Sequence, residues 1–418
     1  MGSVNPTEND ASSYANLASF YEKYPYPAPV EDLSGYIAVW SSTARRRSEY
    51  HLLFPDQAFR EDLDILVAGC GTSQAARHAV RWPSASVLGI DVSEASLRHT
   101  DELKRRHGLS NLETLKLAIE DVGQLDREFD LIICTGVIHH LRSPEAALRS
   151  LRHCLRPDGA LQLMVYAHHG RVGVSMMQEY IRILGIDVAE TEIRDLAETL
   201  KEIPLDHPMS PLLRSSADFR SIGGIADVLM NPRDCDYTVP EFLELLDVCD
   251  LEFGRWVRQA PYRPQCGAFK QTPHGERLTA LAEPEQFAAL ELLRGSMVRH
   301  SAIAYRRQPR FSPNLMWDDK QVLECVPIRL AETMIVTDSP PAGSAAVILN
   351  QSHQDTDLIL PITDAEKRIL DAIDDRSTIA EVAATVSVEG ADFVSGFLKT
   401  LWYHDQITFD LSPLAPKS

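Results

Sequence analysis

Two glycines separated by one residue, Gly69 and Gly71, carry the clearest chemical signal in the sequence. They follow an apolar run at 63–68 and precede a stretch with helical spacing at 72–82. Glycine lets the backbone pass close beneath a ligand, and the first N–H groups of a helix are free to bind one. Because a Gly-x-Gly is weak by itself, a tight turn needed only for packing is the alternative interpretation.

Further polar residues stand where later strands are expected to end. Asp91 closes the apolar run 86–90, at the position where a carboxylate can bridge two ribose hydroxyls. The expected strand 129–134 runs into the segment 135–141, which contains paired histidines. Because parallel strands place their carboxyl ends at one ligand-binding edge, we expect these residues to lie near the glycine turn.

The elements that must position these residues alternate between strand and helix. Apolar runs predict strands at 63–68, 86–90, 112–118, 129–134 and 160–166, with helices at 72–82, 93–107 and 144–155. This alternation implies parallel pairing with right-handed crossovers. The predicted fold class is therefore α/β, a Rossmann-like doubly wound sheet.

The rhythm changes after residue 166. Helices are expected at 174–184, 191–202 and 239–248, and strands at 251–258 and 300–306. If these two strands complete the sheet, a helical insertion occupies about 172–236. We predict an N-terminal helical segment with a Tyr-Pro lid over 1–60, a main domain over 61–307 and a C-terminal domain over 314–418. The Pro-containing stretch 308–313 is the expected linker.

The C-terminal region shows two helix-start signatures. Thr363 with Glu366, and Thr378 with Glu381, each form the pattern of a capping box. A third helix at 391–403 is followed by a strand with alternating apolar residues at 406–410. Three helices and a strand resemble a winged-helix module, for which we expect a regulatory or interaction role.

Charge and composition restrict the function further. The 418-residue chain has 60 acidic and 41 basic side chains, a net charge of −19, which argues against broad binding of nucleic acid. An arginine run at 45–47 is the densest basic patch, and a solvated helix face is its simpler interpretation. No apolar run approaches a membrane span, and residues 1–10 lack the pattern of a secretory signal. The seven scattered cysteines contain no C-x-x-C pair, so we expect a cytoplasmic protein with reduced thiols and no structural zinc.

Taken together, the motifs resemble the class I, seven-stranded methyltransferases that use S-adenosylmethionine. The resemblance covers residues 63–166 and rests on the segments 67–73, 89–93, 129–132, 138–141 and 155–160. It implies S-adenosylmethionine as cofactor and S-adenosylhomocysteine as product. The family's cofactor contacts would then fall on the turn Gly69, Cys70 and Gly71 at the methionine part, on Asp91 at the ribose and on Val92 beside the adenine.

The same resemblance implies two further contact regions. Ile119 and Glu120 would flank the adenine edge, and Thr135 and Gly136 would line the methionine side. The sequence departs from the family pattern at three positions, namely Val67, Ser73 and Ala118. The last departure would leave adenine recognition to Glu120 or Asp121.

A narrower resemblance involves the N-terminal aromatic segment. The residues 20–27, the turn and the segment 166–174 are similar to bacterial protein-lysine methyltransferases, including rickettsial enzymes that modify outer-membrane proteins. In this chain Tyr21, Tyr24 and Tyr26 can cap the cofactor, line a substrate entrance, or pack a helix expected at 11–23 onto the domain.

Candidate catalytic groups follow from the chemistry of methyl transfer. The reaction is an in-line displacement at a sulfonium, and a protonated acceptor such as lysine must first lose a proton. His139, His140 and Tyr166 are the candidates, although the histidines can simply fill a turn. No carboxylate follows the histidine pair at a ligand spacing, so no metal is expected. Cys70 stands beside a helix N-terminus, where a thiol would be acidified, but we assign it no chemistry.

Three functions remain open at this point. The first is methyl transfer to a protein or peptide side chain such as lysine, for which an acidic surface would attract a basic substrate. The second is methylation of a small molecule in a biosynthetic pathway, with the insertion as a lid. The third is a non-catalytic cofactor-binding scaffold. The expected partner is the methyl acceptor, without nucleic acid or membrane, and a homodimer is compatible with the sequence.

Overall fold

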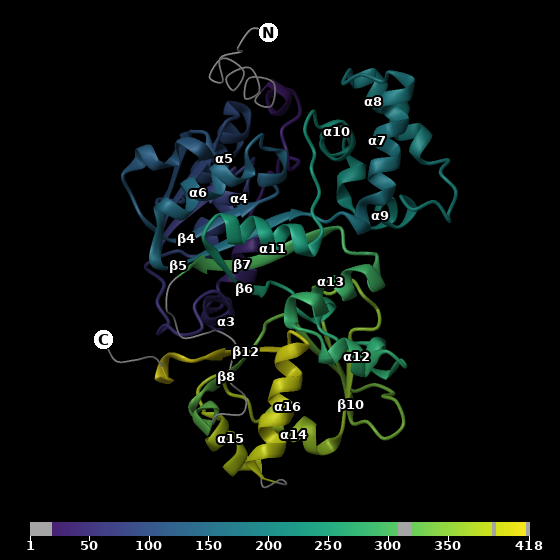
Figure 1. Ribbon diagram of the computed structural model, residues 1–418. Coiled ribbons are helices and arrows are strands. Elements are labelled where there is room, and N and C mark those ends of the chain that lie inside the picture. The colour runs from purple at the N-terminus through teal and green to yellow at the C-terminus, as the bar shows by residue number, and fades with distance from the viewer. Residues whose placement is uncertain (1–18, 308–319, 387–389, 415–418) are drawn as a thin grey trace. The chain divides into compact units, whose positions relative to one another are not determined.

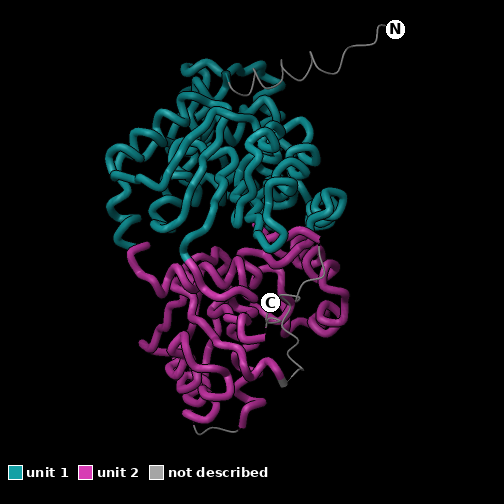
Figure 2. Tube along the Cα trace, turned by 90° about the vertical axis from the view of Figure 1, so that its left-hand side faces the viewer, with its two compact units in different colours: residues 1–39, 61–251, 295–300 teal, residues 40–60, 252–294, 301–418 magenta. Residues whose placement is uncertain are grey.

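The structure is a computed structural model that describes residues 19–307, 320–386 and 390–414. The described chain packs into two compact units (Figure 2). Unit 1 comprises residues 1–39, 61–251 and 295–300, and unit 2 comprises residues 40–60, 252–294 and 301–418. The first part of the helix expected at 11–23 and the linker at 308–313 lie outside the described residues.

One seven-stranded sheet carries the predicted Rossmann-like fold. The strand order is β3-β2-β1-β4-β5-β7-β6. The strands are β1 (Asp64–Ala68), β2 (Ser86–Asp91), β3 (Leu112–Lys116), β4 (Phe129–Thr135), β5 (Leu155–Tyr166), β6 (Leu251–Trp256) and β7 (Arg299–Arg306). The first five pair in parallel, so the carboxyl ends of β1, β2 and β4 meet at one edge, as predicted.

Helices connect the parallel strands, as the alternation of the sequence predicted (Figure 1). They are α4 (Gln74–Arg81), α5 (Glu94–His107) and α6 (Pro144–Cys154). The start of α5 is capped by Ser93, whose hydroxyl accepts from the Ser96 N–H at 3.1 Å, and Gly108 ends it in the left-handed conformation. This cap fixes the backbone directly after Asp91.

β5 begins earlier than predicted. The strand starts at Leu155, not at the predicted residue 160, and a Cβ on Gly159 would lie 2.9 Å from the carbonyl oxygen of Asp130 on β4. The absence of a side chain at Gly159 therefore permits the close approach that continues the pairing. Arg156 adds ion pairs to Asp130 and Asp64, at 2.6 and 2.8 Å.

The helices after β5 form a cluster of their own within unit 1 (Figure 1). They are α7 (Val172–Leu184), α8 (Glu190–Leu200), α9 (Ser210–Ser215) and α10 (Ile222–Met230), and α11 (Val239–Val248) follows them. Their apolar core includes Phe20 and Tyr24 from the N-terminal segment. The insertion and the N-terminal segment therefore share one core.

Unit 2 contains the predicted C-terminal helices and the predicted strand that follows them, together with helices and strands that the sequence did not indicate. The helices are α2 (Ser34–Trp40), which reaches unit 2 only at its last residue, then α3 (Thr43–Leu53), α12 (Gly275–Ala280), α13 (Glu283–Arg294), α14 (Asp364–Asp371), α15 (Ile379–Val386) and α16 (Ala391–Tyr403). The strands are β8 (Val326–Arg329), β9 (Thr333–Val336), β10 (Ala346–Asn350), β11 (Ile359–Ile362) and β12 (Ile407–Asp410).

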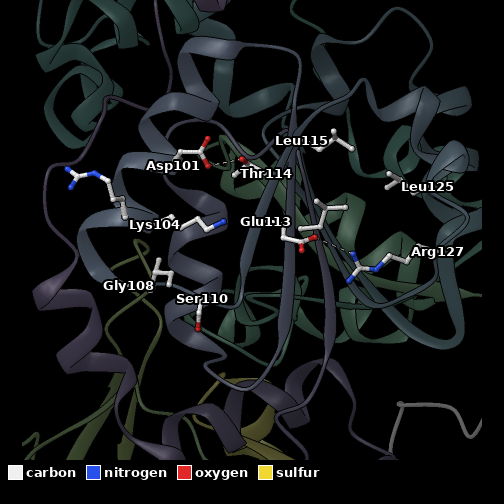
Figure 3. A pocket seen from close by; sticks show the side chains of 12 residues that line it. Asp101, Lys104, Gly108, Ser110, Glu113, Thr114, Leu115, Leu125 and Arg127 are labelled. Atoms are coloured by element: carbon white, nitrogen blue, oxygen red, sulfur yellow. Dashed lines mark hydrogen bonds and ion pairs between the residues drawn. The ribbon is translucent and has the colours of Figure 1, made fainter.

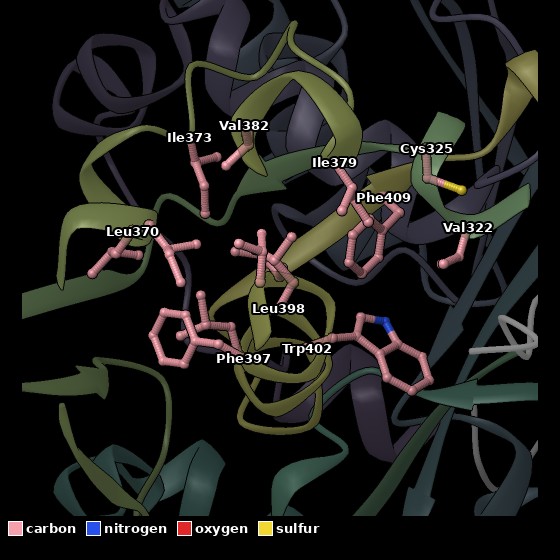
Figure 4. Packing of buried hydrophobic residues seen from close by; sticks show 14 of the residues in the cluster. Val322, Cys325, Leu370, Ile373, Ile379, Val382, Phe397, Leu398, Trp402 and Phe409 are labelled. Carbon is pink, nitrogen blue, oxygen red and sulfur yellow. The ribbon is translucent and has the colours of Figure 1, made fainter. Parts of the chain in front are cut away.

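The three C-terminal helices pack around a single apolar cluster. Figure 4 shows Phe397, Leu398 and Trp402 of α16 among apolar side chains of neighbouring elements. The predicted capping box of Thr363 and Glu366 is present at the start of α14. Antiparallel β9, β10 and β11 form a second small sheet, while β8 pairs with β12. The winged-helix resemblance stays a prediction.

The arginine run at 45–47 lies on α3. Arg45 forms an ion pair with Glu332, Arg46 donates to the Trp40 carbonyl at 2.7 Å, and Arg47 lies 3.3 Å from Asp410. These side chains therefore bind groups within unit 2. The seven cysteines are free thiols, and no helix in the described ranges is long and apolar enough to cross a membrane.

Candidate active site

The glycine turn between β1 and α4 requires both of its glycines. Gly69 and Gly71 have φ of +66° and +54°, a region that other residues rarely adopt. A Cβ on Gly69 would lie 2.4 Å from the Val137 side chain, and one on Gly71 would lie 2.7 Å from the Tyr26 carbonyl oxygen. The turn is therefore tightly packed, and it also lies at the sheet edge where such folds bind ligands. A role in packing and a role in ligand binding are thus compatible.

The side chain of Cys70 is fully buried against β2. A Cβ built on Gly89 would lie 3.1 Å from the Cys70 sulfur, which places the thiol against β2. Burial, with the charge of Asp91, raises the pKa of the Cys70 thiol. The expectation of an acidified thiol is therefore wrong, because desolvation outweighs the helix N-terminus. The predicted contact of Cys70 with the cofactor stays a prediction, and it would be made by the backbone of Cys70.

Asp91 holds the end of β2 to the glycine turn. Its Oδ2 accepts a hydrogen bond from the Gly71 N–H at 2.8 Å, and its Oδ1 accepts from the Ser93 N–H at 2.9 Å. Burial raises the pKa of Asp91, against the lowering effect of these N–H donors. Each carboxylate oxygen keeps a further lone pair, which fits the vicinal hydroxyls of a ribose.

The N-terminal segment lies over this part of the site. Glu22 accepts from the Ala95 N–H at 3.0 Å and from the Ser93 hydroxyl at 3.2 Å, so it binds the start of α5. The Thr72 hydroxyl donates to the Pro27 carbonyl at 2.8 Å. Residues 22–27 therefore bind directly to the glycine turn and its neighbouring helix.

The remaining predicted cofactor residues lie at the same edge of the sheet. Thr135, at the end of β4, accepts a hydrogen bond from the Gln74 side chain, and Gly136 follows with φ of +80°. Val92 is partly exposed beside Asp91, and Ile119 and Glu120 begin a short 3-10 helix after β3. Sequence reasoning missed Gln74, which carries no motif signal of its own.

Tyr24 is bound to the insertion. Its ring is buried in the apolar core of the insertion, and its hydroxyl donates to the Val188 carbonyl at 2.5 Å. Packing, one of the three roles open to the N-terminal tyrosines, is thus observed for Tyr24. A cofactor contact of Tyr24 stays a prediction. Tyr26 donates to Asp218 at 3.0 Å, again on the insertion side.

A second group of polar side chains gathers at the end of β5. The Tyr21 hydroxyl donates to Oδ1 of Asp227 at 2.8 Å, and the Tyr166 hydroxyl lies 3.5 Å from Oδ2. Asn231 donates to the Tyr21 hydroxyl at 3.0 Å. The guanidinium of Arg171 lies 3.6 Å from the centre of the Tyr166 ring. The insertion therefore supplies a buried carboxyl to residues predicted from the sequence.

Burial controls the ionisation of this group. It raises the pKa of the Asp227 carboxyl, which is fully buried, although His140 and the hydrogen bond from Tyr21 act in the opposite direction. Burial and the charge of Asp227 also raise the pKa of Tyr21 and of Tyr166. At neutral pH the two phenols are therefore protonated donors, and Asp227 is a carboxyl with increased proton affinity.

The two histidines adjoin this group. The His139 ring is fully buried, 3.9 Å from the centre of the Tyr166 ring and 4.2 Å from that of His140. Burial, with the charges of His140 and Arg171, lowers the pKa of His139 well below its usual value. A lowered pKa makes the His139 ring a weaker proton acceptor than an ordinary histidine, so a catalytic role of His139 as a base stays a prediction.

A groove between α5 and the edge strand β3 has a different set of lining residues. Figure 3 shows it lined by Lys104 of α5, Glu113 and Thr114 of β3, and Arg127. None of its lining residues is among the predicted site residues. It is an open surface beside the edge strand, and we do not assign it to the active site.

Comparison with known proteins agrees with this arrangement. Residues 66–161 match a family described as a methyltransferase domain. A protein of Synechococcus without an assigned function is 28% identical over 325 residues, which are 75% of this chain and 76% of that protein. The tRNA U34 carboxymethyltransferase of Methylococcus capsulatus is 30% identical over 146 residues, 31% of this chain and 45% of that enzyme. The match thus spans less than half the length of the tRNA enzyme.

Solved structures extend the similarity to most of the chain. The structure of PKMT2 from Rickettsia typhi has a TM-score of 0.63 at 14% identity, covering 88% of this chain and 76% of that chain. Its complex with AdoHcy has a TM-score of 0.61 at 13% identity, covering 88% and 75%. At this level of identity the likeness concerns the fold.

The sheet order, the glycine turn after the first strand and the carboxylate after the second define a Rossmann-like protein that binds a nucleoside-containing cofactor at one sheet edge. Together with the domain match at residues 66–161, they show a methyltransferase domain of the class I, S-adenosylmethionine-dependent type in this chain. This confirms the predicted family, the enzyme class and the cofactor. The assignment of individual residues to parts of the cofactor stays a proposal.

Replacing Gly71 by alanine tests the packing of the turn. The new Cβ would meet the Tyr26 carbonyl at 2.7 Å and the Pro27 Cδ at 2.9 Å, in addition to the strain of a positive φ. We expect a loss of unfolding free energy of about 2 kcal/mol or more, measured by urea denaturation. Gly108→Ala is the matched control, because its φ is +64° with no atom within 4 Å. Equal losses in the two variants would contradict the close packing of residues 26 and 27 against the glycine turn.

Asp91→Ala tests the proposed ribose contact. The change removes a carboxylate that two backbone N–H groups orient, and we expect binding of S-adenosylmethionine to weaken by about 2 kcal/mol or more in calorimetry. Asp101→Ala, at an exposed position of α5, is the control. An Asp91→Ala variant that keeps its folded spectrum and its affinity for the cofactor would refute the assignment.

Proposed function

We propose that this methyltransferase modifies the side-chain amine of a lysine in a protein or peptide. The observation that carries the proposal is the buried carboxyl of Asp227, bound by Tyr21 and lying beside Tyr166 at the end of β5. The resemblance of residues 20–27 and 166–174 to protein-lysine methyltransferases and the fold likeness to PKMT2 support it. The scattered free thiols fit a cytoplasmic location.

The proposed residues divide into two groups. The turn residues Gly69 and Gly71 and the carboxylate of Asp91 would hold the cofactor, which supplies an electrophilic methyl group when bound. Val92, Ile119 and Glu120 would lie at its adenine end, and Thr135 and Gly136 at its methionine end. The second group, Asp227 with the tyrosines, would receive the acceptor.

Asp227 and the tyrosines suit an amine in two ways. An ammonium group is attracted to a buried carboxylate and to the faces of aromatic rings. It must also release a proton before its lone pair can react, and a carboxyl with a raised pKa accepts that proton more readily than an ordinary one. The hydroxyls of Tyr21 and Tyr166 can then orient the neutral amine. Tyr166 is thus proposed as an acceptor-positioning residue, and His139 and His140 as its neighbours.

Labelling is the direct test of the acceptor class. The full chain, supplied with methyl-labelled S-adenosylmethionine, would be mixed separately with a cell protein fraction, a small-metabolite fraction and tRNA. We expect label on lysine in the protein fraction, located by mass spectrometry. Label confined to metabolites would favour the small-molecule alternative, and label in tRNA would refute an amine acceptor. Binding of cofactor without transfer to any fraction would favour the scaffold alternative.

Asp227→Asn tests the proton acceptor. The amide cannot accept the proton, so we expect kcat to fall by roughly 100-fold or more while cofactor affinity is retained. In the unchanged enzyme kcat/KM should rise with pH through an apparent pKa above that of an ordinary carboxyl, because the basic form of Asp227 is required. Asp195→Asn, exposed on α8, is the control.

Tyr21→Phe removes one hydrogen bond to Asp227 without altering its charge. Because the Asp227 carboxyl remains in this variant, Tyr21→Phe still tests the role of Asp227 if the Asp227→Asn variant fails to fold. A kcat unchanged in both variants, with an unchanged pH profile, would contradict the proposed role of Asp227.

A further inference from the structure

We propose that His139, His140 and Asp234 form a binding site for one divalent transition-metal ion of the zinc type. These residues each offer a ligand atom, and the three atoms lie within 4.8 Å of one another. Two of them come from the turn after β4, and Asp234 comes from the end of the helical insertion. The proposal does not depend on the identity of the methyl acceptor.

Unpaired buried atoms carry the argument. Both ring nitrogens of His139 and Oδ1 of Asp234 are buried and have no hydrogen-bond partner among the described residues. The His139 side chain is 0% exposed. Buried polar atoms are almost always paired, and each exception needs an explanation such as an ion. Unpaired atoms on two residues that face the same small volume therefore point to a shared ligand.

The surrounding hydrogen bonds orient the other atoms of the cluster. Nδ1 of His140 lies 2.8 Å from the Arg233 carbonyl, an arrangement that, with the proton on Nδ1, leaves a lone pair on Nε2. Oδ2 of Asp234 accepts from Arg171 at 2.7 Å and from Gln178 at 3.0 Å. Oδ1 of Asp234 has no hydrogen bond within the described part of the chain, and it lies 3.8 Å from Nδ1 of His140, an ion pair only when that ring is protonated.

Arg171 brings a positive charge to the cluster and Asp234 a negative one. Arg171 is the cation that opposes a metal here, and it is engaged by the other oxygen of Asp234. Asp227 is a second carboxyl nearby. Its charge helps to raise the pKa of Tyr166, and the charge of His140 acts to lower the pKa of Asp227. A carboxylate that bridges an arginine and a metal has a close partner for both of its oxygens, whereas without an ion Oδ1 has no hydrogen bond to the residues that the structure describes.

The donor set selects the class of metal. Two imidazole nitrogens and one carboxylate oxygen suit Zn²⁺, Fe²⁺ or Mn²⁺, whereas Mg²⁺ and Ca²⁺ prefer ligand sets made of oxygen alone. The expectation of no metal rested on the absence of a carboxylate near the histidines in sequence. The folded insertion supplies that carboxylate from a distant position. An ion here would fix the end of the insertion to the end of β4.

Metal titration of the full chain tests the site. After treatment with a chelator, the protein would be titrated with Zn²⁺ and, for its visible spectrum, with Co²⁺, in the absence of S-adenosylmethionine. We expect one bound ion per chain and a rise of Tm on adding Zn²⁺. Asp234→Asn and His140→Ala should each weaken binding at least 10-fold. Methyl transfer is not measured, so a failure here is distinguishable from a failure of the proposed function.

Matched controls separate this site from adventitious binding. His168 and Asp236 form a partly exposed pair at 2.9 Å outside the cluster, and Cys235 is an exposed thiol next to Asp234. His168→Ala and Cys235→Ser should therefore leave the affinity for Zn²⁺ unchanged. His139→Cys should retain binding, because a thiolate can replace an imidazole as a zinc ligand, and a role in packing alone would not produce that result.

Several results would overturn the proposal. Absence of a bound ion in the unchanged protein, or an affinity that Asp234→Asn leaves intact, would show that the cluster is not a metal site. Loss of binding in Cys235→Ser or His168→Ala would place the ion elsewhere. If Asp234→Asn or His140→Ala fails to fold, the deciding measurement is made on His139→Cys. A Tm of that variant that Zn²⁺ does not raise would overturn the proposal.

Discussion

The carboxylate of Asp91 is the contact on which the proposed cofactor half of the site depends. One side chain accepts hydrogen bonds from the turn that follows β1 and from the residue that begins α5. It therefore fixes three chain segments at the sheet edge with one negative group. The glycine turn, in turn, leaves no room for a side chain beneath residues 26 and 27, so the N-terminal segment closes directly onto it.

The proposed acceptor half is built by different means. Its central carboxyl, Asp227, lies on α10 in the insertion, and its partners come from the N-terminal segment and from the end of β5. No parallel-sheet rule places these groups together. Their position depends on the common apolar core of the insertion and the N-terminal segment, and on the hydroxyl groups that satisfy a buried carboxyl.

This division explains what could be predicted from the sequence. The strands and helices from β1 to β5, the glycine turn and Asp91 follow from local periodicity and from the rules of parallel sheets. Asp227 and Asp234 could not be found, because a single acidic residue in an irregular insertion carries no spacing signal. The short strands β8 to β11 were missed because runs of four or five residues give too little alternation to recognise. For Cys70 the error was to weigh the helix N-terminus without its burial.

The N-terminal segment has a further consequence for how the two halves act together. Glu22 binds the start of α5, while Tyr21, Tyr24 and Tyr26 bind groups of the insertion. One short stretch of chain thus contacts both halves of the site. If the bound cofactor holds this stretch more firmly, it also holds the proposed acceptor residues and so increases the affinity for the acceptor. Because such coupling is reciprocal, the bound acceptor then increases the affinity for the cofactor by the same factor. Segment 21–26 would then be the physical basis of cooperative binding of the two substrates.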